Sequence, residues 1–179
     1  MSKKQAIRLA EDTLEKYQPK DDLETDIDCI AQKLNIEVKR VDLESHISGS
    51  IVFGPEKTVI LINQNHSETR QRFSLAHELG HFLLHNKENP FFVDSVQIEW
   101  RRENFQYNDF TQEVEANVFA ASILMPEKRI YKYIRNNDLF WFNETDIKTL
   151  AKTFNVSLTA MRIRLVSMGI IDPVGDDSL

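Results

Sequence analysis

Residues 72–85 read RFSLAHELGHFLLH, and three of the five histidines of the chain lie in this stretch. Apolar residues recur around them at helical spacing, which predicts a helix over residues 68–86. Histidines four residues apart share one face of a helix, so His77 and His81 can point at one metal ion. Glu78, beside the first histidine, can reach a water molecule at an open coordination position. The HExxH pattern therefore indicates a zinc site with two ligands and a general base.

The competing interpretation is an ordinary helix whose polar residues face solvent. The apolar neighbours of HELGH, however, are typical of a helix that packs into a core. A buried helix rarely carries two histidines and a glutamate without partners for them. We therefore favour the metal site.

A catalytic zinc normally takes three protein ligands and a water molecule, so one ligand is still missing. The extended pattern HExxHxxGxxH fails here, because Leu84 and Lys87 stand at its glycine and last histidine positions. His85 lies two turns beyond His77, about 12 Å along the axis, too far to share one ion. We expect His85 to cap the helix or to lie at the surface.

The third ligand must come from another segment, and residues 111–126, TQEVEANVFAASILMP, contain Glu113 and Glu115. We predict a helix over residues 109–125, in which these two glutamates point about 200° apart. Glu113 shares its face with Asn117, near small alanines that would let this helix approach the HELGH helix closely. We therefore predict Glu113 as the third ligand. The alternative keeps both glutamates as solvated helix residues.

The sequence also predicts contacts for two neighbours of Glu113. Asn117, one turn after Glu113, is expected to hydrogen-bond a ligand histidine. Glu115 is expected to point toward solvent, Arg72 or another cation.

Composition limits the class of protein. The chain has 179 residues, 41% of them hydrophobic, which is enough for one domain with a real core. A single cysteine excludes an internal disulfide, and the charged N-terminus lacks the apolar segment of a signal peptide. The net charge of −6 argues against nucleic acid as the main partner of the whole surface. We expect a soluble cytoplasmic protein without a membrane segment.

The order of predicted elements is helices, a small sheet, then helices, which indicates an α+β fold. SGSIVFG and KTVILIN, joined by Gly54-Pro55, predict a hairpin, and IEVKRVDL predicts a third strand. Residues 87–108 show no clean period and are interpreted as an ordered loop. We divide the chain into a main domain at residues 1–137 and a helical C-terminal part at residues 138–179.

These segments, in their order along the chain, resemble the ImmA/IrrE family of metallo-endopeptidases. The resemblance rests on SGSIVFG, VILIN, RFSLAHELGHFLLH, EVEANVFAASILMP and LAKTFNVSLTAMRIRL, and it covers roughly residues 25–170. It implies a zincin-like core with a three-stranded sheet and a helix-turn-helix-like C-terminal part. It further implies zinc held by His77, His81 and Glu113, with Glu78 catalytic.

The expected function follows from this resemblance: a zinc-dependent endopeptidase that cleaves a helix-turn-helix transcriptional repressor. Such cleavage would derepress a mobile element or a stress response. Zinc would lower the pKa of its water and polarise the scissile carbonyl, and Glu78 would move a proton from that water to the leaving amine.

The C-terminal segment supports a rival function, because LAKTFNVSLTAMRIRLVSMG also fits a helix-turn-helix that reads DNA. In that interpretation Ala151 lies at the helix crossing, Asn155 at the turn and Met161 in the core. Residues 143–171 hold four cations against two acids, which is little charge for binding phosphates. Specific DNA binding is therefore disfavoured. The remaining alternative is an anti-repressor or regulatory module that acts without proteolysis.

Overall fold

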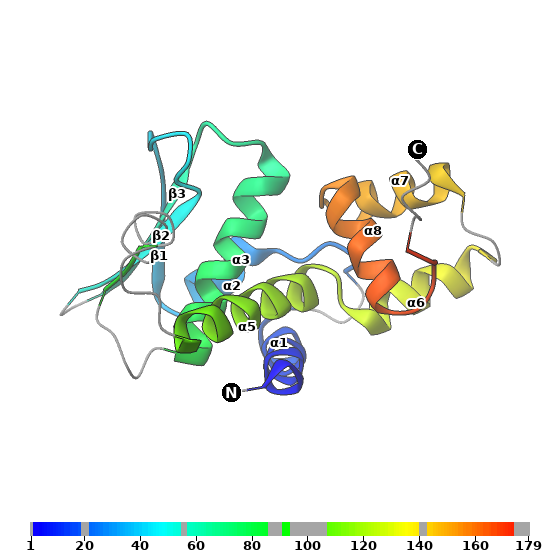
Figure 1. The fold of residues 1–179 in the computed structure, drawn as a ribbon, viewed down its shortest axis with the longest axis horizontal. Coiled ribbons are helices and arrows are strands. Elements are labelled where there is room, and N and C mark those ends of the chain that lie inside the picture. The colour runs from blue at the N-terminus through cyan, green and yellow to red at the C-terminus, as the bar shows by residue number, and fades with distance from the viewer. Residues whose placement is uncertain are drawn as a thin grey trace.

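The computed structural model describes residues 2–18, 22–54, 57–85, 91–93, 107–139 and 143–173. Figure 1 shows a small sheet at one end, helices α3, α5 and α1 beside it, and helices α6, α7 and α8 at the other end. Among the helices of these ranges, none is long and apolar enough to cross a membrane. The order of elements confirms a mixed fold of helices and one small sheet.

The sheet contains the predicted hairpin. Strands β2 (Gly49–Phe53) and β3 (Thr58–Asn63) pair antiparallel, with Ile51 opposite Ile60. Strand β1 (Ile36–Val41) pairs parallel to β3 on its other side. Both isoleucines are fully buried, so the face of the sheet that they occupy is covered by the core.

A fourth strand corrects the interpretation of residues 87–108 as loop. Strand β4 (Phe91–Val93) pairs antiparallel to β2, and the sheet order is β1-β3-β2-β4. Three residues are too few for the alternation typical of a strand to be recognised in the sequence. The strand forms because the edge of β2 is available for pairing. The rest of the predicted loop, residues 86–90 and 94–106, lies outside the described residues.

Two long helices build the centre of the molecule. Helix α3 (Glu68–His85) contacts β2 and β3, and helix α5 (Tyr107–Leu124) packs against α3. Helix α1 (Lys3–Tyr17) covers α5 from the other side, and the short helix α2 (Ile27–Lys33) contacts α3 and β1. The helix predicted over residues 68–86 is thus present to within one residue at its end.

Close contact between α3 and α5 depends on small residues. A Cβ atom placed on Gly80 of α3 would lie 3.1 Å from the Cα of Ala116 on α5. A larger residue at position 80 would therefore push the helices apart. The predicted approach of the alanine-rich helix to the HELGH helix is confirmed at this point.

The C-terminal helices are α6 (Glu127–Asn136), α7 (Glu144–Thr153) and α8 (Leu158–Ser167). Helix α5 ends before Pro126, the N-cap of α6, as the sequence predicts. The turn between α7 and α8 contains Asn155 at a φ of 48°, a left-handed conformation that asparagine tolerates. Ala151 and Met161 are buried where the helices meet. The helix-turn-helix-like interpretation and the division at residues 137 and 138 stay predictions.

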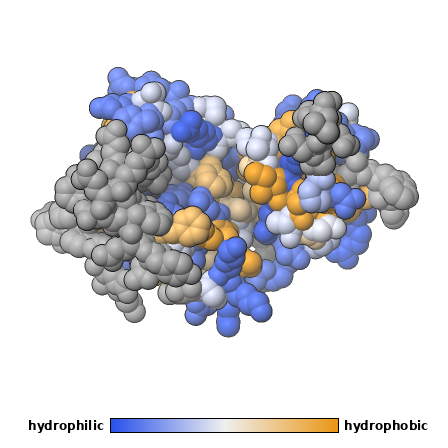
Figure 2. Space-filling view, viewed as in Figure 1, coloured by the Kyte–Doolittle hydropathy of each residue, from blue (hydrophilic) through white to orange (hydrophobic). Residues whose placement is uncertain are grey.

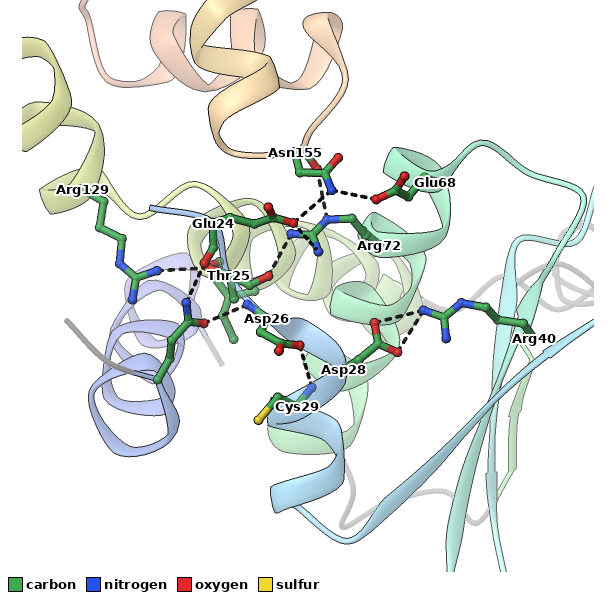
Figure 3. Close-up of polar contacts among 12 residues, drawn as sticks. Glu24, Thr25, Asp26, Asp28, Cys29, Arg40, Glu68, Arg72, Arg129 and Asn155 are labelled. Atoms are coloured by element: carbon green, nitrogen blue, oxygen red, sulfur yellow. Dashed lines mark hydrogen bonds and ion pairs between the residues drawn. The ribbon is translucent and has the colours of Figure 1, made fainter. Parts of the chain in front are cut away.

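A buried arginine connects these helices to the core (Figure 3). Arg72 of α3 donates to the backbone oxygens of Thr25, at 2.8 Å, and Asn155, at 3.1 Å, and pairs with Glu24 at 3.1 Å. The Thr25 hydroxyl donates to the backbone oxygen of Ile123, at 2.7 Å. Three segments that are distant in sequence therefore meet around one guanidinium group, and Thr25 links them to a fourth, helix α5.

Candidate metal centre

The structure brings the three predicted ligands together. His77 and His81 lie one turn apart on α3 and are 5% and 2% exposed. Nε2 of His77 lies 3.4 Å from Glu113 Oε2, and Nε2 of His81 lies 3.3 Å from Glu113 Oε1. One ligand atom from each of the three residues falls within 4.8 Å of the others. This group could hold one metal ion.

The spacing of these atoms fits zinc. Ligands at about 2.0–2.1 Å in a tetrahedron lie roughly 3.3 Å from one another. The two histidine–glutamate distances of 3.4 and 3.3 Å match this value. The two Nε2 atoms are 2.9 Å apart, somewhat closer than a shared ion requires.

The protonation states also suit a metal. Burial lowers the pKa of His81, although Glu113 opposes that effect, so neutral imidazole is favoured. Burial alone would raise the pKa of Glu113, but the adjacent His77 and His81 side chains hold this pKa well below its usual range. Neutral imidazole and ionised carboxylate are the forms that bind a metal ion.

Asn117 contacts His77 as the sequence analysis expects. Nδ1 of His77 lies 3.1 Å from Asn117 Oδ1. Because an amide oxygen only accepts hydrogen bonds, Nδ1 donates, and the lone pair stays on Nε2. Asn117 therefore holds His77 in the tautomer that directs Nε2 toward Glu113.

Glu78 is fully buried, and its surroundings include a residue that the sequence analysis did not single out. A Cβ atom placed on Gly49 of β2 would lie 3.4 Å from Glu78 Oε1 and 3.3 Å from the backbone oxygen of Leu61. Glycine at position 49 thus leaves space for the carboxylate beside the sheet. A glycine at the start of a strand can signal such a close approach, and this signal was available in SGSIVFG.

The expectations for Glu115 and His85 need correction. Glu115 is 2% exposed and lies 3.6 Å from His85 Nε2, so it faces neither solvent nor Arg72. The carboxylate partner of Arg72 is Glu24. The His85 side chain is only 11% exposed and lies inside the α3–α5 contact. Glu115 and His85 stand on the two helices that carry the ligands, and their pairing places both in the seam between those helices.

The chain is similar in sequence to a known protein family and to several known proteins. The family model Peptidase_M78, described as the IrrE N-terminal-like domain, matches residues 31–166. A Bacillus phage phi105 protein named "Uncharacterized immunity region protein 2" is 31% identical over 104 residues, 58% of this chain and 61% of that protein. The radiation response metalloprotease IrrE of Deinococcus radiodurans is 40% identical over 75 residues, 42% of this chain and 21% of that protein.

A solved structure agrees in fold. A Mycobacterium tuberculosis transcriptional regulator superposes with a TM-score of 0.60 over 90% of this chain and 46% of its own, at 15% identity. That likeness concerns the fold alone. The chain spans less than two thirds of the length of each of these relatives.

The fold and the converging histidines and glutamate define a candidate metalloprotein. Because the family model matches well over half of its length, the chain belongs to the ImmA/IrrE family, whose curated relatives include proteins named metalloproteases.

Proposed function

We propose that the protein is a zinc-dependent endopeptidase that cleaves a helix-turn-helix transcriptional repressor. The observation that carries this proposal is the convergence of His77, His81 and Glu113 beside a buried Glu78. The repressor as substrate is carried over from the ImmA/IrrE family resemblance, and one relative of the chain is a phage protein named for an immunity region. The zincin-like character of the core belongs to the same proposal.

Each site residue has a defined task in this reaction. His77, His81 and Glu113 would hold zinc, which polarises the scissile carbonyl and makes a water molecule more acidic. Glu78 accepts a proton from the attacking water while the water oxygen bonds to the carbonyl carbon. When the carbon–nitrogen bond breaks, Glu78 returns the proton to the leaving amine. Asn117 keeps His77 in the required tautomer throughout.

Glu78 is shielded from bulk solvent, which suits a general base that must act on one bound water molecule. Glu113 is the most exposed of the three ligand side chains, at 21%, so substrate would approach from the α5 side.

The test compares the wild type with Glu78→Gln. Each is co-expressed with a helix-turn-helix repressor encoded beside its gene, and full-length and cut repressor are measured. Glu78→Gln should keep its zinc and fold but cleave about 10²–10⁴-fold more slowly. Equal derepression by both proteins, with the repressor intact in each, would show that the protein acts by binding and would reject the peptidase.

A further inference from the structure

A groove of about 860 Å³ lies between α3 and α5 on one side and α8 on the other. Its apolar lining includes Phe73, Val118, Met125 and Ile163. Figure 2 shows hydrophobic residues gathered in the hollow between the central helices and the C-terminal helices. Ile163 is 64% exposed, an unusual position for a large apolar side chain.

The charge of this groove is opposite to that of the chain. Lys3, Arg70 and Arg164 line it, and none of the described residues at its wall carries a carboxylate. The chain as a whole has a net charge of −6. An apolar groove with a cationic margin complements an apolar segment that carries Asp or Glu at its edges.

The groove adjoins the metal centre through one shared residue, Asn117. Asn117 lines it and also hydrogen-bonds the ligand His77. Along α8 the lining extends from Ser157 to Ser167, roughly 15 Å at the rise of a helix. A segment bound there would extend over several residues and end beside the ligands.

The walls of the groove are held in place by polar contacts behind it (Figure 3). Arg72 fixes the turn before α8 through the Asn155 backbone oxygen, and the Asn155 amide donates to Glu24 and Glu68. Arg164 donates to the Met125 backbone oxygen at 3.1 Å. The groove is therefore built into the fold, and its occupant need not open it.

We propose that this groove docks an apolar, acidic segment of the protein substrate and so delivers the adjoining chain to the metal centre. This inference rests on the proposed peptidase function. A nucleic acid fits less well, because three cations beside a mostly aliphatic lining offer neither a phosphate track nor a series of stacking rings.

Binding is tested with a displayed library of random 16-residue peptides, selected on the full-length Glu78→Gln protein so that cleavage does not interfere. Selected peptides should be enriched in apolar residues together with Asp and Glu. Their affinity, measured by fluorescence anisotropy, should fall about tenfold or more on Ile163→Glu and on Arg70→Glu. Both changes are at exposed positions, so folding should survive. Tyr131→Glu, an exposed apolar position on α6 outside the groove, is the matched control and should bind normally.

Several outcomes would overturn the proposal. They are a library that yields no binder, selected peptides that are basic or lack a charge preference, and equal binding to Ile163→Glu. Binding of a 20-base-pair random duplex at physiological salt, lost on Arg70→Glu, would assign the groove to DNA instead.

The same variants separate this proposal from the peptidase function. If docking fails and the peptidase is correct, Ile163→Glu cleaves the repressor as fast as the wild type, and cleavage still requires Glu78. If the peptidase fails and docking is correct, the peptides bind through the groove while Glu78→Gln and wild type leave the repressor equally intact.

Discussion

His77 is oriented by two separate elements. Its position on α3 aims Nε2 at Glu113, and Asn117 on α5 accepts a hydrogen bond from Nδ1. The second contact decides which nitrogen is available to a metal, which the HExxH spacing alone leaves open. Selection of a ligand atom thus depends on a residue 40 positions away.

Glu113 and Glu115 allow a direct test of the ligand assignment. Glu113→Gln should lose most bound zinc, because an amide is a weak ligand beside two histidines. Glu115→Gln, a matched change two residues away, should keep its zinc, since Glu115 faces His85. Metal content per chain by mass spectrometry measures both. Retention by Glu113→Gln with loss by Glu115→Gln would contradict the assignment.

Gly49 tests the space around Glu78. In Gly49→Ala the new Cβ would lie 3.4 Å from Glu78 Oε1 and 3.2 Å from Ile62 Cδ1. The tighter contacts, with Ile62 and with the Leu61 backbone oxygen at 3.3 Å, should shift β2 slightly relative to the Glu78 carboxylate. We expect this shift to slow cleavage by on the order of tenfold while zinc content stays the same. Rates and metal content should be measured on the same preparation. Unchanged cleavage would show that Glu78 tolerates the shift or takes no part in the reaction.

At the scale of elements, the contact between α3 and α5 determines the site, because each helix contributes ligands. Gly80 lets the two backbones approach each other. The pair of His85 on α3 and Glu115 on α5 makes a further contact between the same helices. A metal bound by His77, His81 and Glu113 would cross-link the two helices. Stability and metal binding should therefore change together when this contact is altered.

Gly80→Ala should weaken zinc binding and destabilise the fold. The added Cβ would meet the Ala116 backbone at 3.1 and 3.2 Å, and backbone cannot move aside as a side chain end can. Overpacking costs about 1–3 kcal/mol, against a gain of about 1 kcal/mol from better helix propensity. Zinc titration and thermal unfolding measure both effects.

Lys148→Ala, at an exposed position within α7, controls for a change in helix propensity alone. It should leave zinc affinity unchanged. Wild-type zinc affinity in Gly80→Ala would show that the α3–α5 distance does not govern the site.

At the scale of the whole molecule, the Arg72 contacts attach the C-terminal helices to the core (Figure 3). Arg72 is 8% exposed and connects the segment before α2, helix α3 and the α7–α8 turn. Without its guanidinium group, the backbone oxygens of Thr25 and Asn155 would lose a charged donor. Both the stability of the chain and the shape of the groove should depend on it.

Arg72→Ala should lower the free energy of unfolding by on the order of 3 kcal/mol, because buried acceptors lose their donor. Arg40→Ala is the control. It removes an ion pair with Asp28 at 2.9 Å, but that pair is exposed and should contribute at most about 1 kcal/mol. Urea unfolding of both variants gives the comparison. Equal losses would show that burial of Arg72 does not make its contacts stronger.

The sequence by itself determined the local elements of this protein. Helix α3, the β2–β3 hairpin and the end of α5 at Pro126 follow from periodicity, β-branched residues and proline, which act within a few residues. The spacing of His77 and His81 on one helical face is equally local. Glu113 could be chosen over Glu115 because helix geometry separates their directions, and the structure places Glu113 beside both histidines.

Only the tertiary structure decided the rest. Strand β4 exists because β2 offers an edge, and the His85–Glu115 pair exists because α5 lies against α3. Arg72 and Asn155 are 83 residues apart, and the groove combines residues from α1, α3, α5 and α8. Such contacts depend on how helices and strands pack against one another. Because the contacting residues are distant in sequence, no local sequence pattern predicts their contacts.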